Sequence, residues 1–448
     1  MHGVHDGVCT PRDVIGGTVQ RRSKSLAVLA AAVLVAPLAA CGGGDDGPPV
    51  LTWYTNPDAG GQAAIAARCT EEADGAYRIV TSGLPTQAAA QREQLARRLA
   101  AHDSSIDIMS LDPPFIPELA EPDFLAPMPE DVADAVSADV VQGALDGATW
   151  KGELVTAPFW ANTQLLWYRT SVVEAAGLDM TQPVTWDQLI DATEEQDMLL
   201  AVQGAKAESL TVWVNALVAS AGGAIVENPE AGRDELSLGL DTDAGQAAAT
   251  ILEKIGTTGV GGPGLPTEDE NASLSIFQGD QGSFMVNWPF VWAATQSAVE
   301  EGTLDQAVLD DIGWALYPRV LEDTETAPPY GGINLGVGAF SEHVDLAYDA
   351  VQCIVSPENQ AEYFLTNGNP PANATAFDDP AVQEAFPMAA TIRDSLELAV
   401  PRPQTPYYNE VSTGLQETWH PVDGVDPATT PGASADLIIA VLRGEKLL

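Results

Sequence analysis

The chain has 448 residues, of which 45% are hydrophobic, and its formal net charge is −45 at pH 7. The apolar fraction is ordinary for a globular protein, and the length favours two lobes over one small domain. The strong acidity argues against a nucleic-acid partner, which would require a basic surface. The acidic residues are scattered along the chain, so they predict a solvated surface and say little about a ligand.

The N-terminus has the features of an export signal. A positive cluster over residues 21–24 precedes an apolar run over 26–40, and Cys41 follows. The run is too short for a bilayer-spanning helix, which needs about 20 apolar residues. Because it ends in Leu-Ala-Ala-Cys, it resembles a bacterial lipobox, in which the peptide is cut before a cysteine that receives a diacylglycerol. We expect residues 1–40 to be a lipoprotein signal peptide and 41–48 a lipidated flexible tether; the alternative is a plain secretory signal with a chance cysteine.

Two further cysteines would remain in the exported chain. Cys69 and Cys353 would lie in an oxidising compartment, where disulfides persist. A bridge between them would join an early helix to a late one, so the lobes would have to be discontinuous in sequence. The alternative is a pair of buried free thiols.

The apolar pattern predicts strands that alternate with helices. In chain order, we expect a strand over 50–55, a helix over 62–72, a strand over 77–82, a helix over 87–101, strands over 106–111 and 152–158, a helix capped by Thr185, helices over 209–220, 244–255 and 271–278, strands over 282–287 and 330–338, a helix over 347–355 and a helix capped by Ser356. This alternation predicts an α/β fold with a mostly parallel sheet covered by helices. In such sheets ligands lie beyond the carboxyl ends of the strands.

Six segments in order resemble the solute-binding proteins of carbohydrate ABC importers. They are residues 51–54, 106–112, 185–189, 277–288, 331–334 and 356–372, and together they span nearly all of the exported chain. A narrower resemblance concerns the trehalose-binding lipoproteins of trehalose-recycling importers. It rests on residues 162–169, 286–290 and 401–406.

The resemblance implies a two-lobed, periplasmic-binding-protein-like fold of type II, similar to maltose-binding protein, with a hinge and an interlobe cleft. One lobe would comprise 49–156 plus 330–395, and the other 157–329 plus 396–448. The implied ligand is a trehalose-like disaccharide, and the implied partners are the permease and ATPase subunits of an ABC importer. We expect a monomer without cofactor or metal, held by its lipid at Cys41 on the outer face of the cytoplasmic membrane.

A sugar site needs carboxylates and amides for the hydroxyl groups, and aromatic faces for the rings. Asp112 and Asn56 follow predicted strands. Gly332 has no side chain and would let the backbone approach a ligand closely. Arg402 lies between two prolines in a chain with few cations, and its guanidinium could donate two hydrogen bonds to neighbouring hydroxyl groups of a sugar. The predicted ligand-binding residues are Asp112, Asn162, Glu270, Trp288, Phe290, Gly332, Arg402 and Asn56. Structural alternatives remain open for them. Asp112 could cap a turn, Asn162 could be a loop residue, and Glu270 could interact only with a helix dipole. Trp288 could be a core aromatic, Gly332 could form a strand bulge, and Arg402 could form a surface ion pair.

Two other functions remain open from the residues alone. One is a lipid-anchored glycoside-processing enzyme with paired carboxylates, and the other is an adhesin or receptor ectodomain. The sequence contains no nucleophile elbow, HExxH, P-loop or CxxC motif. We therefore expect binding without catalysis, in which two lobes close about a hinge around the sugar.

Overall fold

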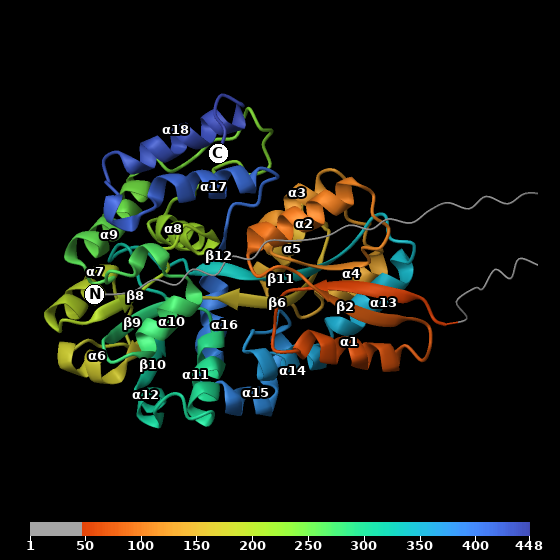
Figure 1. The fold of residues 1–448 in the computed structure, drawn as a ribbon, viewed down its shortest axis with the longest axis horizontal. Helices are drawn as coiled ribbons and strands as arrows, with labels where there is room; N and C mark the ends of the chain where they lie inside the picture. Colours follow the sequence, from red (N-terminus) through yellow and green to blue (C-terminus); the bar gives the residue numbers. More distant parts are fainter. Residues whose placement is uncertain (1–46) are drawn as a thin grey trace, which may run out of the picture. The chain divides into compact units, whose positions relative to one another are not determined.

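The computed structural model describes residues 47–448, so the predicted signal peptide, Cys41 and most of the tether lie outside the described residues. A six-stranded sheet contains the first strands of the chain. Its members are β1 (Val50–Thr55), β2 (Arg78–Gly83), β3 (Ile108–Leu111), β6 (Ala157–Thr163), β11 (Pro329–Val337) and β12 (Val400–Pro401). The order is β12-β11-β3-β1-β2, and β6 pairs with the opposite side of β11, so that β11 crosses the middle of the ribbon (Figure 1).

This sheet is mixed: three of its five strand pairings are parallel, as predicted, and the other two are antiparallel. Strand β1 is parallel to β2 and β3, as helix-connected neighbours should be, but β11 is antiparallel to both β3 and β6. The reason is that β11 does not follow β3 through a crossover helix. It returns from a distant part of the chain and can therefore enter in the opposite direction.

A second sheet has four strands in the order β10-β7-β9-β8. They are β7 (Leu165–Arg169), β8 (Leu199–Ala201), β9 (Gly282–Asn287) and β10 (Ile312–Ala315). Strand β7 is antiparallel to β9 and β10, and only β8 and β9 are parallel. Strands β4 (Thr149–Trp150) and β5 (Glu153–Leu154) form a separate hairpin. The sequence predicted β9 with these bounds, whereas it assigned no strand to 159–169.

Helices connect and cover the two sheets. Up to β11 they are α1 (Gly61–Glu72), α2 (Ala88–Ala100), α3 (Ile116–Ala120), α4 (Glu130–Ser137), α5 (Gln142–Ala148), α6 (Thr170–Ala176), α7 (Trp186–Glu195), α8 (Glu208–Ser220), α9 (Asp243–Thr258), α10 (Glu270–Gln278), α11 (Phe290–Glu300) and α12 (Gln306–Asp310). After β11 follow α13 (Val344–Ile354), α14 (Pro357–Asn367), α15 (Pro380–Ala385), α16 (Ala389–Leu398), α17 (Tyr408–Trp419) and α18 (Thr430–Leu442). Short 3-10 turns include η1 (Pro113–Phe115).

The two predicted helix caps are confirmed. The Thr185 side chain accepts a hydrogen bond from the Gln188 N–H, and the Gln188 side chain accepts one from the Thr185 N–H, which completes a capping box at α7. The Ser356 side chain accepts from the Asn359 N–H, with Pro357 as the first residue of α14. Both caps satisfy donors that a helix start leaves free.

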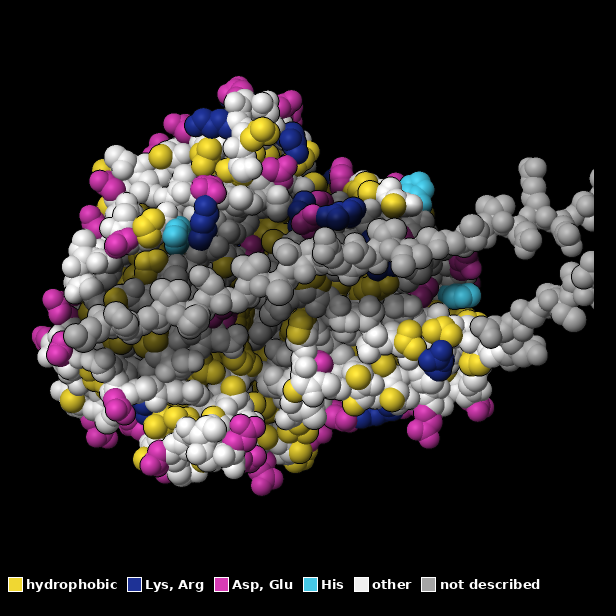
Figure 2. Space-filling model, in the orientation of Figure 1, with side chains coloured by type: hydrophobic (Ala, Val, Ile, Leu, Met, Phe, Trp, Pro, Cys, Tyr) yellow, Lys and Arg dark blue, Asp and Glu magenta, His cyan; other side chains and the backbone are white. Residues whose placement is uncertain are grey.

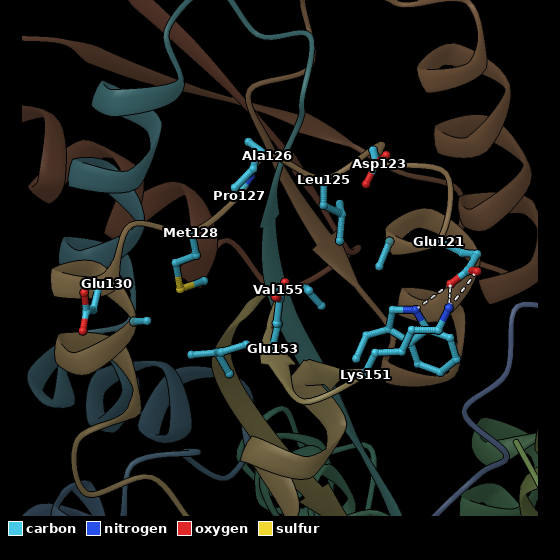
Figure 3. Close-up of a pocket in the computed structure, with 14 residues that line it drawn as sticks. Glu121, Asp123, Leu125, Ala126, Pro127, Met128, Glu130, Lys151, Glu153 and Val155 are labelled. Carbon is cyan, nitrogen blue, oxygen red and sulfur yellow. Dashed lines mark hydrogen bonds and ion pairs between the residues drawn. The ribbon is translucent and has the colours of Figure 1, made fainter. Parts of the chain in front are cut away.

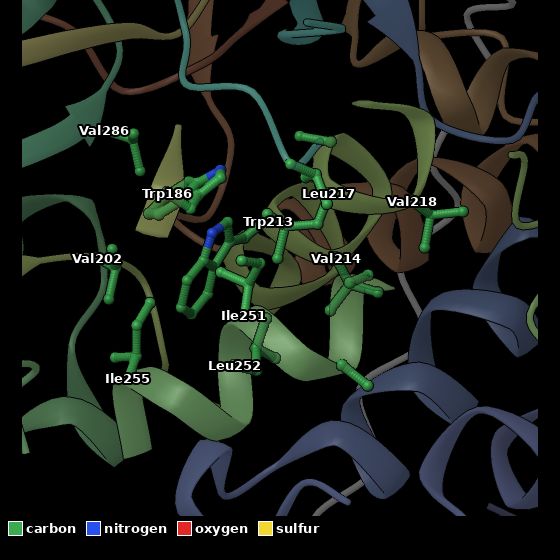
Figure 4. Packing of buried hydrophobic residues seen from close by; sticks show 14 of the residues in the cluster. Trp186, Val202, Trp213, Val214, Leu217, Val218, Ile251, Leu252, Ile255 and Val286 are labelled. Atoms are coloured by element: carbon green, nitrogen blue, oxygen red, sulfur yellow. The ribbon is translucent and has the colours of Figure 1, made fainter. Parts of the chain in front are cut away.

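Each sheet packs on its own apolar core. Beside the four-stranded sheet, Trp186 and Trp213 lie among aliphatic side chains of α8 and α9, and both are fully buried (Figure 4). The six-stranded sheet packs on α1 and α13, and a disulfide joins these helices through Cys69 and Cys353. The predicted disulfide is therefore present, and it links segments separated by 284 residues in sequence.

Acidic side chains are dispersed over the visible face in Figure 2 and gather in no single large patch, as the sequence predicts. Within residues 47–448, no helix combines the length and apolar character needed to cross a bilayer.

Candidate functional site

A buried ion-pair cluster joins segments that are far apart in the sequence. Arg402 follows β12, and its side chain is only 4% exposed. Its Nη2 donates to Oδ1 of Asp112 at 2.6 Å, and its Nη1 donates to Oε1 of Glu208 at 2.6 Å. Asp112 comes directly after β3, and Glu208 is the first residue of α8. One guanidinium thus holds a carboxylate beside the six-stranded sheet and another beside the second core.

Glu208 is the central residue that sequence reasoning missed. Besides Arg402, the hydroxyl groups of Tyr408 and Ser412 on α17 donate to its carboxylate, the latter at 2.8 Å. Tyr408 in turn packs edge-on against Phe115, with ring centroids 5.3 Å apart. An acidic residue at the start of an apolar helix is usually explained by the helix dipole, so it is the contacts with Arg402, Tyr408 and Ser412 that distinguish Glu208.

The electrostatics of the cluster follow from burial and from the carboxylate pair. Burial raises the pKa of Asp112; Arg402 opposes this shift and the negative charge of Glu208 adds to it. Burial also acts to lower the pKa of the Arg402 guanidinium, but the two carboxylates outweigh it and hold that pKa above its ordinary value. Arg402 is therefore a permanent cation whose two terminal amino groups are engaged, and its fork is directed at carboxylates of the protein.

The predicted acid Glu270 lies near the same cluster. It is the first residue of α10, whose cap is the neighbouring Asp269. Burial raises the pKa of Glu270, and the charges of Asp269 and Glu208 contribute to the rise. Glu268 is 3% exposed, its Oε2 has no partner among the described residues, and burial raises its pKa to about 7. Glu270 rather than Glu268 or Asp269 is thus the residue of this segment that senses Arg402 and Glu208.

A second group of predicted residues gathers at β11. Asn162 of β6 is the register partner of Gly331. Trp288 follows β9 and is partly exposed. If Gly331 carried a Cβ atom, that atom would lie only 2.9 Å from Cη2 of the Trp288 indole. The indole therefore packs against bare backbone of β11. Tyr330, the preceding residue, is close enough to Asp112 for that carboxylate to help raise its pKa, although burial is the larger cause.

Gly332 is required by its own backbone. Its φ is +126°, and a Cβ atom there would lie 2.2 Å from the carbonyl oxygen of Trp160. Replacing Gly332 with alanine is therefore expected to lower the free energy of unfolding by at least about 2 kcal/mol, measured by urea denaturation. Gly83→Ala is the control, since nothing lies within 4 Å of the added atom, and it should change stability by no more than about 0.5 kcal/mol. Equal effects of the two substitutions would show that the Gly332 backbone is unstrained.

The two remaining predicted residues have other neighbours in the described part of the chain. Phe290 is the first residue of α11. Its backbone packs closely on Gly368, since a Cβ atom added to that glycine would lie 3.0 Å from the Phe290 Cα. Asn56 follows β1; its Nδ2 donates to Gln91 Oε1 at 2.9 Å, while its Oδ1 is buried and without a partner. Their roles as ligand residues remain predictions.

A cavity of about 820 Å³ lies elsewhere, between the loop after α3 and the β4–β5 hairpin (Figure 3). The figure shows Glu121 held by Lys151 and an indole, which is that of Trp150. None of the predicted ligand residues lines this cavity. A smaller one, of about 210 Å³, is lined by residues on both sides of Arg402 and by the second half of α8. Among the described residues no group of His, Cys, Asp and Glu is arranged to hold a metal ion.

A family model described as "Bacterial extracellular solute-binding protein" matches residues 52–361. A probable ABC transporter-binding protein of Deinococcus radiodurans is 26% identical over 356 residues, which cover 76% of this chain and 80% of that protein. A mannitol-binding protein of Pseudomonas aeruginosa is 24% identical over 238 residues, 52% of each chain.

Solved structures are similar over most of the described residues. Maltose-bound MalE3 of T. maritima superposes with a TM-score of 0.73 at 22% identity, covering 89% of this chain and 100% of that one. The GacH receptor of Streptomyces glaucescens, solved unliganded and with acarbose, gives a TM-score of 0.71 at 18% identity and covers 89% and 98%.

Proposed function

The chain belongs to the bacterial extracellular solute-binding protein family, and from this premise we propose that it captures a trehalose-like disaccharide outside the cell and delivers it to an ABC importer. Its fold is the α/β fold of type II periplasmic binding proteins, similar to maltose-binding proteins. A solute-binding protein is the non-enzymatic component of a transporter, so the paired carboxylates bind rather than cleave. The permease and ATPase subunits of the importer would be its partners.

The observation that carries this proposal is the Asp112–Arg402–Glu208 bridge. It joins residues beside the two separate sheets at the carboxyl end of β3, where ligands of open α/β sheets bind. Within residues 47–448 the hydrogen bond of the Asp112 side chain is the one from Arg402 to Oδ1, so Oδ2 can accept a hydrogen bond from a sugar hydroxyl. Trp288 supplies a partly exposed aromatic face for a sugar ring.

The mechanism would be hinge closure of two lobes. We assign 49–156 plus 330–395 to one lobe and 157–329 plus 396–448 to the other, with the ligand between them. Docking of the closed form on the permease would complete delivery.

Attachment through Cys41 would keep the protein beside that permease. The supporting observations are the apolar run over 26–40, the Leu-Ala-Ala-Cys ending and the glycine-rich residues that follow. Mass spectrometry of the membrane fraction tests it: a diacylglyceryl group on an N-terminal Cys41 is expected, and a mature chain lacking the lipid would contradict it.

The function is tested by thermal shift of the 42–448 fragment with trehalose, maltose and mannitol, together with product analysis after long incubation. Stabilisation by trehalose without release of glucose is the expected result. Stabilisation by mannitol alone would refute the disaccharide, and glucose release would refute a binding-only role.

Substitutions at the site should weaken binding of the stabilising sugar. Asp112→Asn and Trp288→Ala are each expected to raise Kd by about tenfold or more, since a hydrogen bond to a charged group or a stacked ring contributes about 1.4 kcal/mol or more. Calorimetric titration measures this. Asp378→Asn, which removes the same charge from an exposed pair with Arg393, serves as the control and should leave Kd unchanged. A change below about twofold for Asp112→Asn would remove that residue from the site.

A further inference from the structure

The cluster holds more negative than positive charge. Asp112 and Glu208 contact Arg402 directly, and Glu270 and Asp269 lie close enough to act on one another electrostatically. Arg402 is the basic residue that the described part of the chain brings to these carboxylates. Two carboxylates, those of Asp112 and Glu208, pair with one guanidinium, and Glu270 lies near them, so acidic groups outnumber basic ones at the site.

The oxygen atoms left free belong to the acids. Arg402 uses Nη1 and Nη2 on Glu208 and Asp112, and its remaining Nε is buried. Arg402 is the side-chain partner of Asp112, and it engages Oδ1; the Glu270 carboxylate has no side-chain partner within residues 47–448, and its one hydrogen bond is to the backbone of its own residue. A ligand that reaches this cluster consequently meets carboxylate acceptors, whereas Arg402, the cation that the described residues bring there, already pairs with two of them.

We infer that this site selects its sugar by charge: it admits neutral sugars and sugars that carry an amino group, and it rejects sugars that carry a carboxylate or phosphate. The inference rests on the proposed function, because it concerns the substrate class of the same site. Arg402 acts as a positioning residue that holds two carboxylates for the sugar hydroxyls.

The physical reason is the cost of placing like charges together out of water. An anionic group would lose its hydration and would have to compete with Asp112 and Glu208 for a single guanidinium that already pairs with both. An ammonium group keeps its positive charge, can donate to Asp112 Oδ2 or Glu270, and compensates the excess negative charge. A neutral hydroxyl group can donate to the same oxygen atoms, and it brings neither the repulsion of an anion nor the charge compensation of an ammonium group.

Three ligands of matched size test the inference: trehalose, trehalose with one primary hydroxyl replaced by an amino group, and trehalose with one primary alcohol oxidised to a carboxylate. Kd is measured by titration calorimetry at pH 7 in two salt concentrations. We expect the carboxylate to bind at least about tenfold more weakly than trehalose and the amine at least as tightly. Should the sugar panel favour maltose, the same changes are made on a maltose primary hydroxyl.

Glu270→Gln provides the decisive variant, since the Glu270 carboxylate has no side-chain partner among the described residues and the substitution removes one acidic group while keeping the shape of the side chain. It should reduce the preference for the parent sugar over the carboxylate by about threefold or more. Glu93→Gln, a surface change in an exposed pair with Arg97, removes the same charge and should leave the ratio unaltered.

The outcomes separate the two proposals. If neutral sugars bind and the carboxylate derivative binds within twofold of its parent, selection by charge is wrong while sugar capture stands. If Glu93→Gln changes the ratio as much as Glu270→Gln does, the discrimination belongs to the whole acidic surface, and the inference about this site fails. If no neutral sugar binds at all, the proposed function fails and the inference fails with it.

Discussion

Replacing Arg402 with methionine is expected to lower the free energy of unfolding at pH 7 by about 3–5 kcal/mol. The side chain is 4% exposed, and its carboxylate partners are 15% and 16% exposed. Removing the cation leaves Asp112 and Glu208 close together, buried and without compensation. Urea denaturation followed by circular dichroism measures the loss, and sugar binding should disappear with it because the two carboxylates are no longer held.

The loss should depend on pH in a defined direction. Burial already raises the pKa of Asp112 in the folded protein, and without Arg402 this pKa rises further. The folded variant then binds the proton more tightly than the unfolded chain, whose aspartates titrate near about 4. Its stability therefore increases as pH falls from 7 toward that value, so the difference from wild type should be smaller at pH 5 than at pH 7.

Arg97→Met is the matched control, because Arg97 pairs with Glu93 on an exposed helix face. It should cost about 0.5 kcal/mol or less at either pH. A loss below about 1 kcal/mol for Arg402→Met would mean that the carboxylates are not forced together in solution. A loss that is the same at pH 5 and pH 7 would show that packing, not charge, accounts for the effect.

Removing the disulfide is the second change with a large expected effect. Cys69→Ala combined with Cys353→Ala should lower the free energy of unfolding by about 3–5 kcal/mol. The bridge closes a loop spanning 284 residues, so it restricts the unfolded chain strongly, and Cys69 is fully buried. The measurement is urea unfolding of the variant and of wild type, each with and without reductant.

Reductant should reduce the stability of wild type to that of the double variant and leave the variant unchanged. Affinity for the sugar should be preserved, since α1 and α13 contribute no residue to the Arg402 cluster. A variant within about 1 kcal/mol of wild type would mean that the reduced chain keeps α1 and α13 packed without the bond.

The sequence predicted elements whose signals are local. The helices capped by Thr185 and Ser356 and the strand over 282–287 carry caps or apolar runs that the structure reproduces. The consecutive strands β6 and β7 were not predicted, because residues 157–169 form an almost continuous buried run without alternation. The antiparallel direction of β11 could not be predicted either, because no local sequence feature of a strand indicates whether it runs parallel to its neighbours.

The residues of the Arg402 cluster also differ in whether a local sequence feature points to them. Asp112 could be predicted because a strand end at the sheet edge is a local feature, and Arg402 because cations are rare in this chain. Glu208 could not, since its partner Arg402 is 194 positions away and its own surroundings indicate only a helix start. The packing of Trp288 on Gly331 likewise depends on two strands from different sheets meeting.

The place of β11 has a consequence for how the chain matures. β11 lies between β3 and β6, yet it ends only at Val337. A growing polypeptide therefore carries two unpaired strand edges until three-quarters or so of it has been synthesised, and it cannot complete its first sheet early. The six-stranded sheet can therefore close only when the last quarter or so of the chain is being added, which would leave an extracellular protein incompletely folded for most of its synthesis.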